Sequence, residues 1–273
     1  MTNNGNPYIE LMKQCLMGSI YRQNSWLLLT PGKRGWIREW FIRKLAARSY
    51  GLVKFIPEVD QEDTGKTWPF LGYTMIGRKR LDNIEQCVND VITKGVPGDL
   101  IETGVWRGGS TIFMRALLKQ HSVKDRFGWV ADSFEGLPKP NTDKYGEKAG
   151  DDLSMEPVLK VSLEDVQRNF ARFGLLDDQV KFLKGWFSQT LPKAPINKLS
   201  VLRLDGDLYE STIDVLKSLY DRVSPGGYVI VDDYYSWESC KAAVQDFRQE
   251  RGIKAEIQPI DWTGCFWQVP PNQ

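Results

Sequence analysis

The sequence has few of the residues that build disulfide frameworks and zinc sites. Its 273 residues include four cysteines and one histidine. The cysteines Cys15, Cys87, Cys240 and Cys265 are widely spaced and form no Cys-x-x-Cys pair, which argues against both kinds of site and is typical of a reducing compartment. Because His121 is the sole histidine, we expect any acid–base chemistry to depend on Asp, Glu, Lys or Tyr.

The chain also has almost no net charge and no long apolar run. Its 36 Lys and Arg residues nearly balance 35 Asp and Glu residues, so no overall field attracts nucleic acid. No stretch reaches the roughly 18 apolar residues of a membrane span. The length and the 41% hydrophobic content suit one large domain, or one domain with an appendage. We therefore expect a cytoplasmic globular protein without a nucleic-acid partner or an integral membrane segment.

Helices and strands alternate from about residue 80 to the C-terminus. The expected helices cover residues 80–94, 110–120, 163–173, 212–223 and 236–251. The expected strands cover residues 99–104, 127–132, 179–183, 200–204 and 228–231, and a hairpin follows at 255–260 and 265–269. This order predicts an α/β fold with a Rossmann-like parallel sheet covered by helices on both faces, and a C-terminal antiparallel hairpin of the kind found in methyltransferases.

The N-terminal residues do not continue this alternation. We expect residues 1–72 to form a helical appendage that contributes lid, substrate or dimer contacts, and residues 73–273 to form the main domain. Within the appendage, residues 35–47 place Trp36 and Trp40 on one apolar stripe, opposite basic residues. Three alternatives stay open for this helix: packing on the core or on a second subunit of a homodimer or higher oligomer, covering the substrate, or lying on a membrane surface. The long polar loop at residues 141–157 is a second candidate lid.

Four carboxylates follow two of the expected strands. Asp205 and Asp207 come after the fourth strand, and Asp232 and Asp233 end the fifth. Charges so close to a core are costly unless they are paired, hydrogen-bonded or bound to a metal. Since these two strands are neighbours in this sheet type, the carboxylates can converge, and an all-oxygen donor set favours Mg²⁺ on Asp205, Asp232 and Asp233. Asp207 is then free as a general base; helix capping and turn bonding explain each acid singly but not the set.

A glycine-rich turn follows the first expected strand and precedes a helix. The carboxylate of Glu102, just before Gly104, would repel a pyrophosphate but could receive an amine, which favours S-adenosylmethionine over a dinucleotide. Asp132 ends the second strand, where an acid can accept both ribose hydroxyls of an adenosyl group. Gly185 and Trp186 end the third strand and suit the flank of an adenine ring, although aromatic residues there could simply close the sheet edge.

Five segments together, residues 101–109, 132–138, 184–192, 204–212 and 231–234, resemble the macrocin O-methyltransferase family. The resemblance extends from about Tyr73 to the C-terminus. It implies a seven-stranded class I methyltransferase fold, S-adenosylmethionine and Mg²⁺ as cofactors, and methylation of sugar hydroxyls on macrolide or aminocoumarin natural products. Carried over to this sequence, it implies Asp205, Asp232 and Asp233 as metal ligands and Asp205 and Asp207 as catalytic residues. It implies as cofactor-binding residues Tyr73, Thr74, Met75, Glu102, Thr103, Gly104, Val105, Asp132, Ser133, Gly185 and Trp186.

Two other functions remain open. A phenol or catechol could replace the sugar, because two adjacent ring oxygens would chelate the same ion. The absence of an obvious lysine beside the metal strands favours an Asp base and a sugar. A non-catalytic S-adenosylmethionine-binding scaffold is the alternative outside enzymes, and it would leave the four acids without a role.

Overall fold

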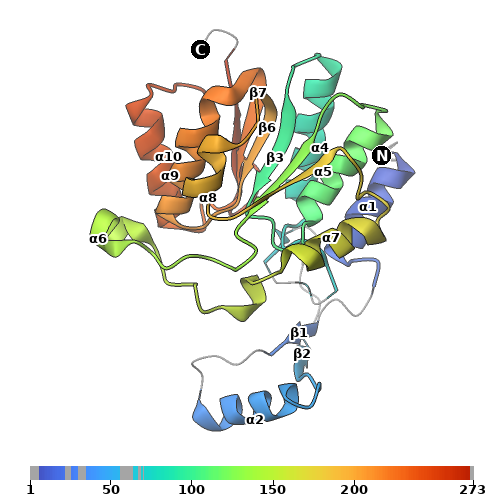
Figure 1. Cartoon of the computed structure of the whole chain (residues 1–273), viewed down its shortest axis with the longest axis vertical. Coiled ribbons are helices and arrows are strands. Elements are labelled where there is room, and N and C mark those ends of the chain that lie inside the picture. The colour runs from blue at the N-terminus through green and yellow to red at the C-terminus, as the bar shows by residue number, and fades with distance from the viewer. Residues whose placement is uncertain are drawn as a thin grey trace.

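The computed structural model describes residues 6–21, 26–29, 35–55, 64–66, 69 and 71–270. A mixed sheet of seven strands runs through its centre (Figure 1). Its strands lie in the order β5-β4-β3-β6-β7-β9-β8. The parallel strands are β3 (Asp99–Thr103), β4 (Gly128–Asp132), β5 (Val180–Lys184), β6 (Leu199–Leu204) and β7 (Val223–Val231). The antiparallel hairpin consists of β8 (Gln258–Pro259) and β9 (Cys265–Gln268). The predicted sheet and its closing hairpin are therefore confirmed.

The strand order reverses between β3 and β6, and this reversal positions the site. From β3 the chain proceeds outward to β4 and β5, then returns to the other side of β3 as β6 and β7. In such sheets ligands bind outside the carboxyl ends of the strands at the reversal point. Thr103 lies opposite Leu204, and Leu204 lies opposite Val231. The residues that follow these three positions consequently emerge side by side.

Helices cover both faces of the sheet, as the alternating pattern predicted. One face carries α1 (Pro7–Met17), α4 (Arg78–Thr93), α5 (Gly109–Gln120) and α7 (Leu163–Arg172). The other carries α8 (Phe187–Thr190), α9 (Tyr209–Leu219) and α10 (Glu238–Glu250). Because side chains alternate along a strand, Val201 of β6 packs on the first face, while Leu202 and Leu204 pack on the second.

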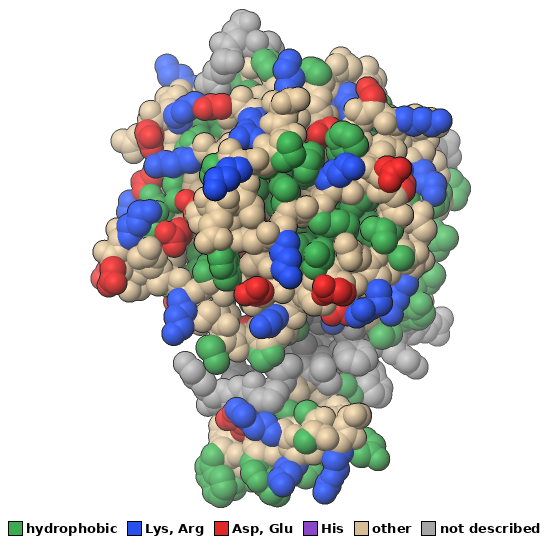
Figure 2. All heavy atoms as spheres, viewed as in Figure 1, with side chains coloured by type: hydrophobic (Ala, Val, Ile, Leu, Met, Phe, Trp, Pro, Cys, Tyr) green, Lys and Arg blue, Asp and Glu red, His purple; other side chains and the backbone are tan. Residues whose placement is uncertain are grey.

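The N-terminal residues divide into two parts. The apolar side chains of α1, such as Leu16, lie in the main core. In contrast, α2 (Trp36–Ala46) and the antiparallel pair β1 (Trp26–Leu28) and β2 (Val53–Phe55) project from the main body (Figures 1 and 2). Trp36 is 81% exposed and Trp40 is 57% exposed, so this stripe does not pack on the core of its own chain, which is one of the alternatives left open. The lid, second-subunit and membrane alternatives, and the domain boundary after residue 72, stay predictions.

The long loop after β4 contains short helical turns. These are α6 (Thr142–Tyr145), η1 (Gly146–Ala149) and η2 (Pro157–Leu159). No helix in the described part of the chain is both long and apolar enough to cross a membrane. All four cysteines are free thiols. His121 caps the end of α5, where its Nε2 lies 2.8 Å from Asn89 Oδ1.

Candidate active site

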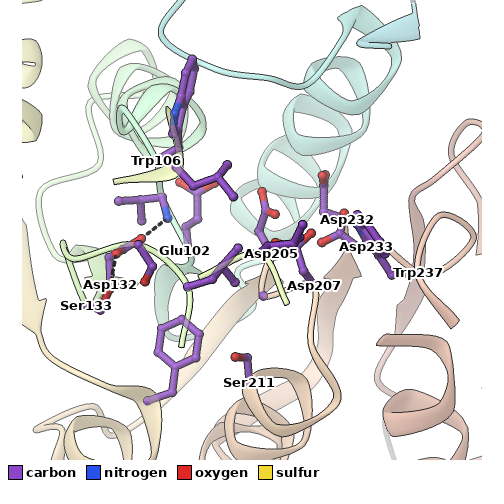
Figure 3. Close-up of a pocket in the computed structure, with 18 of the residues that line it drawn as sticks. Glu102, Trp106, Asp132, Ser133, Asp205, Asp207, Ser211, Asp232, Asp233 and Trp237 are labelled. Carbon is purple, nitrogen blue, oxygen red and sulfur yellow. Dashed lines mark hydrogen bonds between the residues drawn. The ribbon is translucent and has the colours of Figure 1, made fainter. Parts of the chain in front are cut away.

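A cavity of about 630 Å³ lies at the carboxyl ends of the parallel strands (Figure 3). Its wall combines residues that follow β3, β4, β5, β6 and β7 with parts of the long loop, including Leu153 and Leu159. We call the part around β3 and β4 the β3–β4 end, and the part around β6 and β7 the β6–β7 end. The predicted site residues that line the cavity are Thr74, Met75, Glu102, Gly104, Val105, Asp132, Ser133, Gly185, Trp186, Asp205, Asp207, Asp232 and Asp233.

The β3–β4 end is ordered largely by hydrogen bonds to backbone groups. Asp132 Oδ2 accepts the N–H of Val105 at 2.8 Å, and its Oδ1 accepts the N–H of Phe134 at 2.7 Å. Burial raises the pKa of Asp132, while these backbone hydrogen bonds oppose the rise. Ser133 donates its hydroxyl to the carbonyl of Gly136 at 2.8 Å. Asp132 thus ties the turns after β3 and β4 together, and it lines the cavity.

Gly104 marks the point where the two ends of the cavity meet. Its φ is +86°, and a Cβ atom at this position would lie 1.7 Å from the carbonyl oxygen of Asp205. Any other residue would therefore be strained and would collide with the turn after β6. The glycine in this turn is required by the close approach of β3 and β6.

Glu102 is buried beneath this turn. The hydroxyl of Thr111 donates to its Oε2, and Arg203 Nη1 lies 2.6 Å from its Oε1. Burial raises the pKa of Glu102 to about 7, and the charge of Arg203 opposes that rise. Its side chain consequently depends on two partners from neighbouring elements for its position.

Two predicted cofactor residues do not line the cavity. The Tyr73 carbonyl accepts the N–H of Gly109 at 2.9 Å, and its ring packs edge-on against Phe173 with centroids 5.0 Å apart. Thr103 donates its hydroxyl to the carbonyl of Arg203 at 3.3 Å. Each of the two residues is next in the chain to a residue that lines the cavity, and its contacts help to hold that part of the backbone in place.

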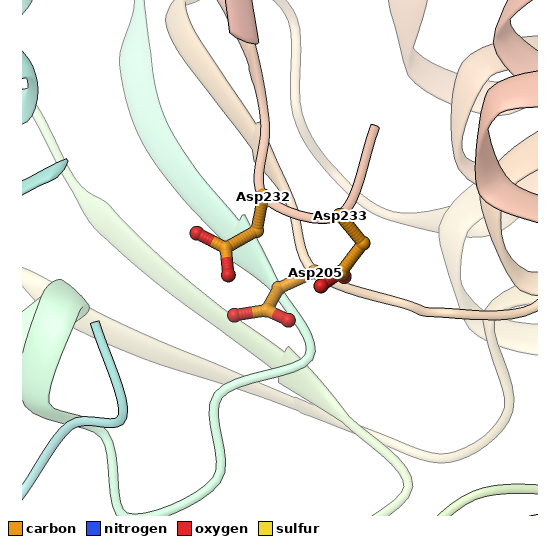
Figure 4. A group of neighbouring side chains, drawn as sticks. All are labelled: Asp205, Asp232 and Asp233. Carbon is orange, nitrogen blue, oxygen red and sulfur yellow. The ribbon is translucent and has the colours of Figure 1, made fainter. Parts of the chain in front are cut away.

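Three carboxylates converge at the β6–β7 end (Figure 4). One oxygen each from Asp205, Asp232 and Asp233 lies within 4.8 Å of the others. The pairing of Leu204 with Val231 produces this arrangement, because it brings the two acid-bearing turns together. Asp233 Oδ2 is buried and has no hydrogen-bond partner among the described residues. Such a group requires a partner, and a purely oxygen donor set fits a hard divalent cation.

Asp207 lies beside this group with an unusual backbone conformation. Its φ is +53°, and its carbonyl accepts the hydroxyl of Ser239 at 2.9 Å. Burial, followed by the charges of Asp205 and Asp232, raises the pKa of Asp207 to about 8, although a hydrogen bond from Trp237 opposes this. Burial and the charge of Asp232 raise the pKa of Asp205 to about 6. A carboxylate with a pKa near neutrality is suited to proton transfer.

Sequence reasoning missed two buried arginines in the site. Arg203 contacts Asp205 and Asp232, and Arg80 of α4 contacts the other oxygen of Asp232. Arg203 could have been found, since a cation inside the apolar run of β6 requires acidic partners. Nothing in the sequence around Arg80 distinguishes it from the other basic residues at the start of α4. The aromatic wall residues Trp237 and Trp262 were also missed.

A family model described as Macrocin-O-methyltransferase (TylF) matches residues 5–269 of the chain. The chain belongs to the macrocin O-methyltransferase family. It is 54% identical over 213 residues, or 78% of this chain and 81% of the relative, to 8-demethyl-8-(2,3-dimethoxy-alpha-L-rhamnosyl)-tetracenomycin-C 4'-O-methyltransferase of Streptomyces olivaceus. It is 48% identical over 232 residues, or 84% of this chain and 91% of the relative, to mycinamicin III 3''-O-methyltransferase of Micromonospora griseorubida.

The solved structure of the O-methyltransferase NovP has the same fold. It shares 46% identity with this chain at a TM-score of 0.82, and the match covers 96% of this chain and 98% of that one. The predicted family, the class I methyltransferase fold and the identification as an O-methyltransferase are therefore confirmed.

Proposed function

We propose that this O-methyltransferase transfers a methyl group from S-adenosylmethionine to a sugar hydroxyl of a natural product, and that it requires Mg²⁺. The observation that carries this proposal is one cavity that joins the two ends described above, with Asp207 beside the three converging carboxylates. The relatives' names support the sugar, since one names a rhamnosyl compound as the molecule that is methylated.

In this proposal the β3–β4 end holds the cofactor. Asp132 has acceptor capacity for ribose hydroxyls, and Trp186 lines the cavity where an adenine ring would lie. Buried Glu102 provides a negative charge below the turn, where it would attract the amino group of the methionine part.

Asp205, Asp232 and Asp233 would hold the Mg²⁺ ion. When bound, Mg²⁺ supplies positive charge that lowers the pKa of an adjacent hydroxyl group. Asp207 would accept the proton of that hydroxyl on a carboxylate oxygen, and its raised pKa makes it a stronger base than an ordinary aspartate. The cavity wall would align the acceptor oxygen with the methyl group, and such alignment can supply several kcal/mol of the barrier reduction.

A phenol or catechol acceptor is the second candidate. Trp237, Trp262 and Phe187 line the cavity, and an aromatic ring would pack well against such side chains. The sugar is preferred because a relative at 54% identity is named for a rhamnosyl compound.

The decisive experiment is to incubate the protein with labelled S-adenosylmethionine, MgCl₂ and a panel of glycosides and phenols, with and without EDTA. We expect transfer to a glycoside that EDTA abolishes and added Mg²⁺ restores. Transfer to phenols alone would favour the second candidate, and transfer that is indifferent to EDTA would refute the metal requirement. Binding of S-adenosylmethionine without transfer to any compound would favour a scaffold.

A further inference from the structure

Arg203 and Glu102 are neighbours across the central pair of strands. Glu102 of β3 lies directly opposite Arg203 of β6 in the parallel register. Residues opposite one another on adjacent strands point to the same face of the sheet, so these side chains meet beneath the floor of the cavity. Arg203 is 0% exposed and Glu102 is 1% exposed. Water therefore does not solvate this pair, and its charges depend on one another.

The guanidinium of Arg203 bonds to acids from both ends of the cavity. Its Nη1 lies 2.6 Å from Glu102 Oε1 and 2.9 Å from Asp205 Oδ2, and its Nη2 donates to Asp232 Oδ1. Glu102 belongs to the β3–β4 end, whereas Asp205 and Asp232 belong to the converging carboxylates. One side chain thus connects the two ends through three charge-assisted hydrogen bonds.

The second arginine restricts Asp232 further. Arg80 Nη1 donates to Asp232 Oδ2, so both oxygens of this carboxylate are held by guanidinium groups. Asp205 is held only through Oδ2, and Asp233 Oδ2 has no partner among the residues described. The arginines therefore set the orientation of two of the three carboxylates, while the third stays available.

We propose that Arg203 is a positioning residue that orients Glu102 for the cofactor and Asp205 and Asp232 for the metal at the same time. This inference rests on the proposed function. The planar guanidinium presents its N–H groups in a fixed fork, so it can hold three carboxylates in fixed directions. A lysine keeps the charge but offers a single ammonium centre that cannot reproduce this geometry. Charge and geometry can therefore be separated by one substitution.

The test is Arg203→Lys, measured by binding and not by turnover. The affinity for Mn²⁺ is followed by electron paramagnetic resonance, and the affinity for S-adenosylhomocysteine by calorimetry. We expect the Mn²⁺ dissociation constant to rise by about tenfold or more, the usual effect of losing a group that orients metal ligands. The S-adenosylhomocysteine dissociation constant should rise with it, because Glu102 loses its bond to Arg203. The loss of Mn²⁺ affinity cannot come from lost charge, because the substitution keeps the charge.

Arg115→Lys is the matched control. Arg115 of α5 is also a buried arginine, 5% exposed, and pairs with Asp177 through Nε at 3.0 Å and Nη2 at 2.6 Å. It does not line the cavity. We expect Arg115→Lys to lose thermal stability, as Arg203→Lys does. Its dissociation constants for Mn²⁺ and S-adenosylhomocysteine should stay within about twofold of the wild-type values. A folded Arg203→Lys protein with both constants within twofold would overturn the proposal.

A second variant keeps the proposal testable if Arg203→Lys does not fold. Glu102→Gln weakens one of the three bonds of Arg203 without altering Asp205 or Asp232. The control is Asp99→Asn, which removes one acid from the opposite end of β3. We expect Mn²⁺ to bind about fivefold more weakly to Glu102→Gln than to Asp99→Asn. Equal Mn²⁺ affinity in these two variants would overturn the proposal.

The outcomes also separate this proposal from the proposed function. If the wild-type protein binds no Mn²⁺, the metal requirement and the metal part of this inference fail together, and the S-adenosylhomocysteine constants still decide the role toward Glu102. If the wild-type protein binds Mn²⁺ and Arg203→Lys binds it equally well, only the role of Arg203 fails.

Discussion

The β3–β4 end and the β6–β7 end of the cavity hold their carboxylates in opposite ways. At the β3–β4 end, Asp132 accepts backbone N–H groups with both oxygens, so the chain itself satisfies it. At the β6–β7 end, burial, followed by the charges of neighbouring carboxylates, raises the pKa values of Asp205, Asp207 and Asp233, and Asp233 Oδ2 has no partner in the described part of the chain. The backbone thus satisfies Asp132 in the folded chain, whereas the second end leaves a buried carboxylate oxygen for the proposed cation. Substitutions that leave the bonds of Arg203 intact should therefore act mainly on their own end.

The largest expected effect comes from Asp205→Asn. Because this change removes a proposed metal ligand, we expect turnover on the acceptor found in the panel to fall by about 10³-fold or more, as several kcal/mol of stabilisation are lost. Mn²⁺ binding should become undetectable, while the dissociation constant of S-adenosylhomocysteine stays within about fivefold. Asp246→Asn, outside the cavity wall, serves as the control. An equally large loss of S-adenosylhomocysteine affinity would contradict the separation of the two ends.

Asp207→Asn should have the next largest effect. An amide cannot accept the acceptor's proton, so we expect a decrease in turnover of about 10²-fold or more, the usual contribution of a general base. Mn²⁺ and S-adenosylhomocysteine should bind within about threefold of the wild-type values, since Asp207 is not one of the three converging carboxylates. Single-turnover kinetics provide the measurement. Near-normal turnover with Mg²⁺ present would show that another group takes the proton.

The third prediction concerns the β3–β4 end. Asp132→Asn replaces one acceptor oxygen with an N–H₂ group, so the N–H of Val105 or Phe134 loses its partner. Leaving such a group unpaired costs about 1–3 kcal/mol, and a cost of that size in cofactor binding corresponds to about 5- to 150-fold in S-adenosylhomocysteine affinity measured by calorimetry. Mn²⁺ affinity should not change. The exposed Asp125→Asn controls for the lost charge, and a parallel loss of Mn²⁺ affinity would refute the comparison.

Sequence patterns predict the acids of the site better than the cations. The sequence predicts the proximity of Asp205, Asp232 and Asp233, because the ends of adjacent strands place the residues that follow them side by side. In the structure β6 and β7 are paired in this way, with Leu204 opposite Val231. The contact of Arg80 with Asp232 joins residues 152 positions apart in the chain. It depends on how α4 packs against the sheet, and no local pattern encodes that packing.

The apolar stripe of α2 shows a second limit of sequence patterns. Periodicity predicts a helix at residues 35–47 with Trp36 and Trp40 on one stripe, and the structure has a helix at Trp36–Ala46. It does not predict what the stripe contacts, because any apolar partner would satisfy the same pattern. In the chain described here both tryptophans are exposed.

The smallest expected effect is a pH dependence of the stability of the metal-free protein. The pKa values of Asp205 and Asp207 rise to about 6 and about 8 in the folded state, above the value of about 4 expected in the unfolded chain. Folding then favours the protonated carboxyls, so their contribution to stability is complete below about pH 4 and is lost as the pH rises through 6 to 8. Glu102, whose pKa rises to about 7, adds to this loss.

The interval from pH 5 to pH 8 spans the titration of these groups. Paired acids with lowered pKa values, such as Asp177, are ionised throughout it, and the chain has one histidine. We expect the melting temperature of the EDTA-treated protein to fall by a few degrees from pH 5 to pH 8. Added Mg²⁺ should raise the melting temperature more at pH 8 than at pH 5, because metal ligands must be deprotonated. The increase caused by Mg²⁺ should be smaller in Asp233→Asn than in the wild-type protein. A metal-free protein more stable at pH 8 would mean that the carboxylates of the β6–β7 end are satisfied without a cation.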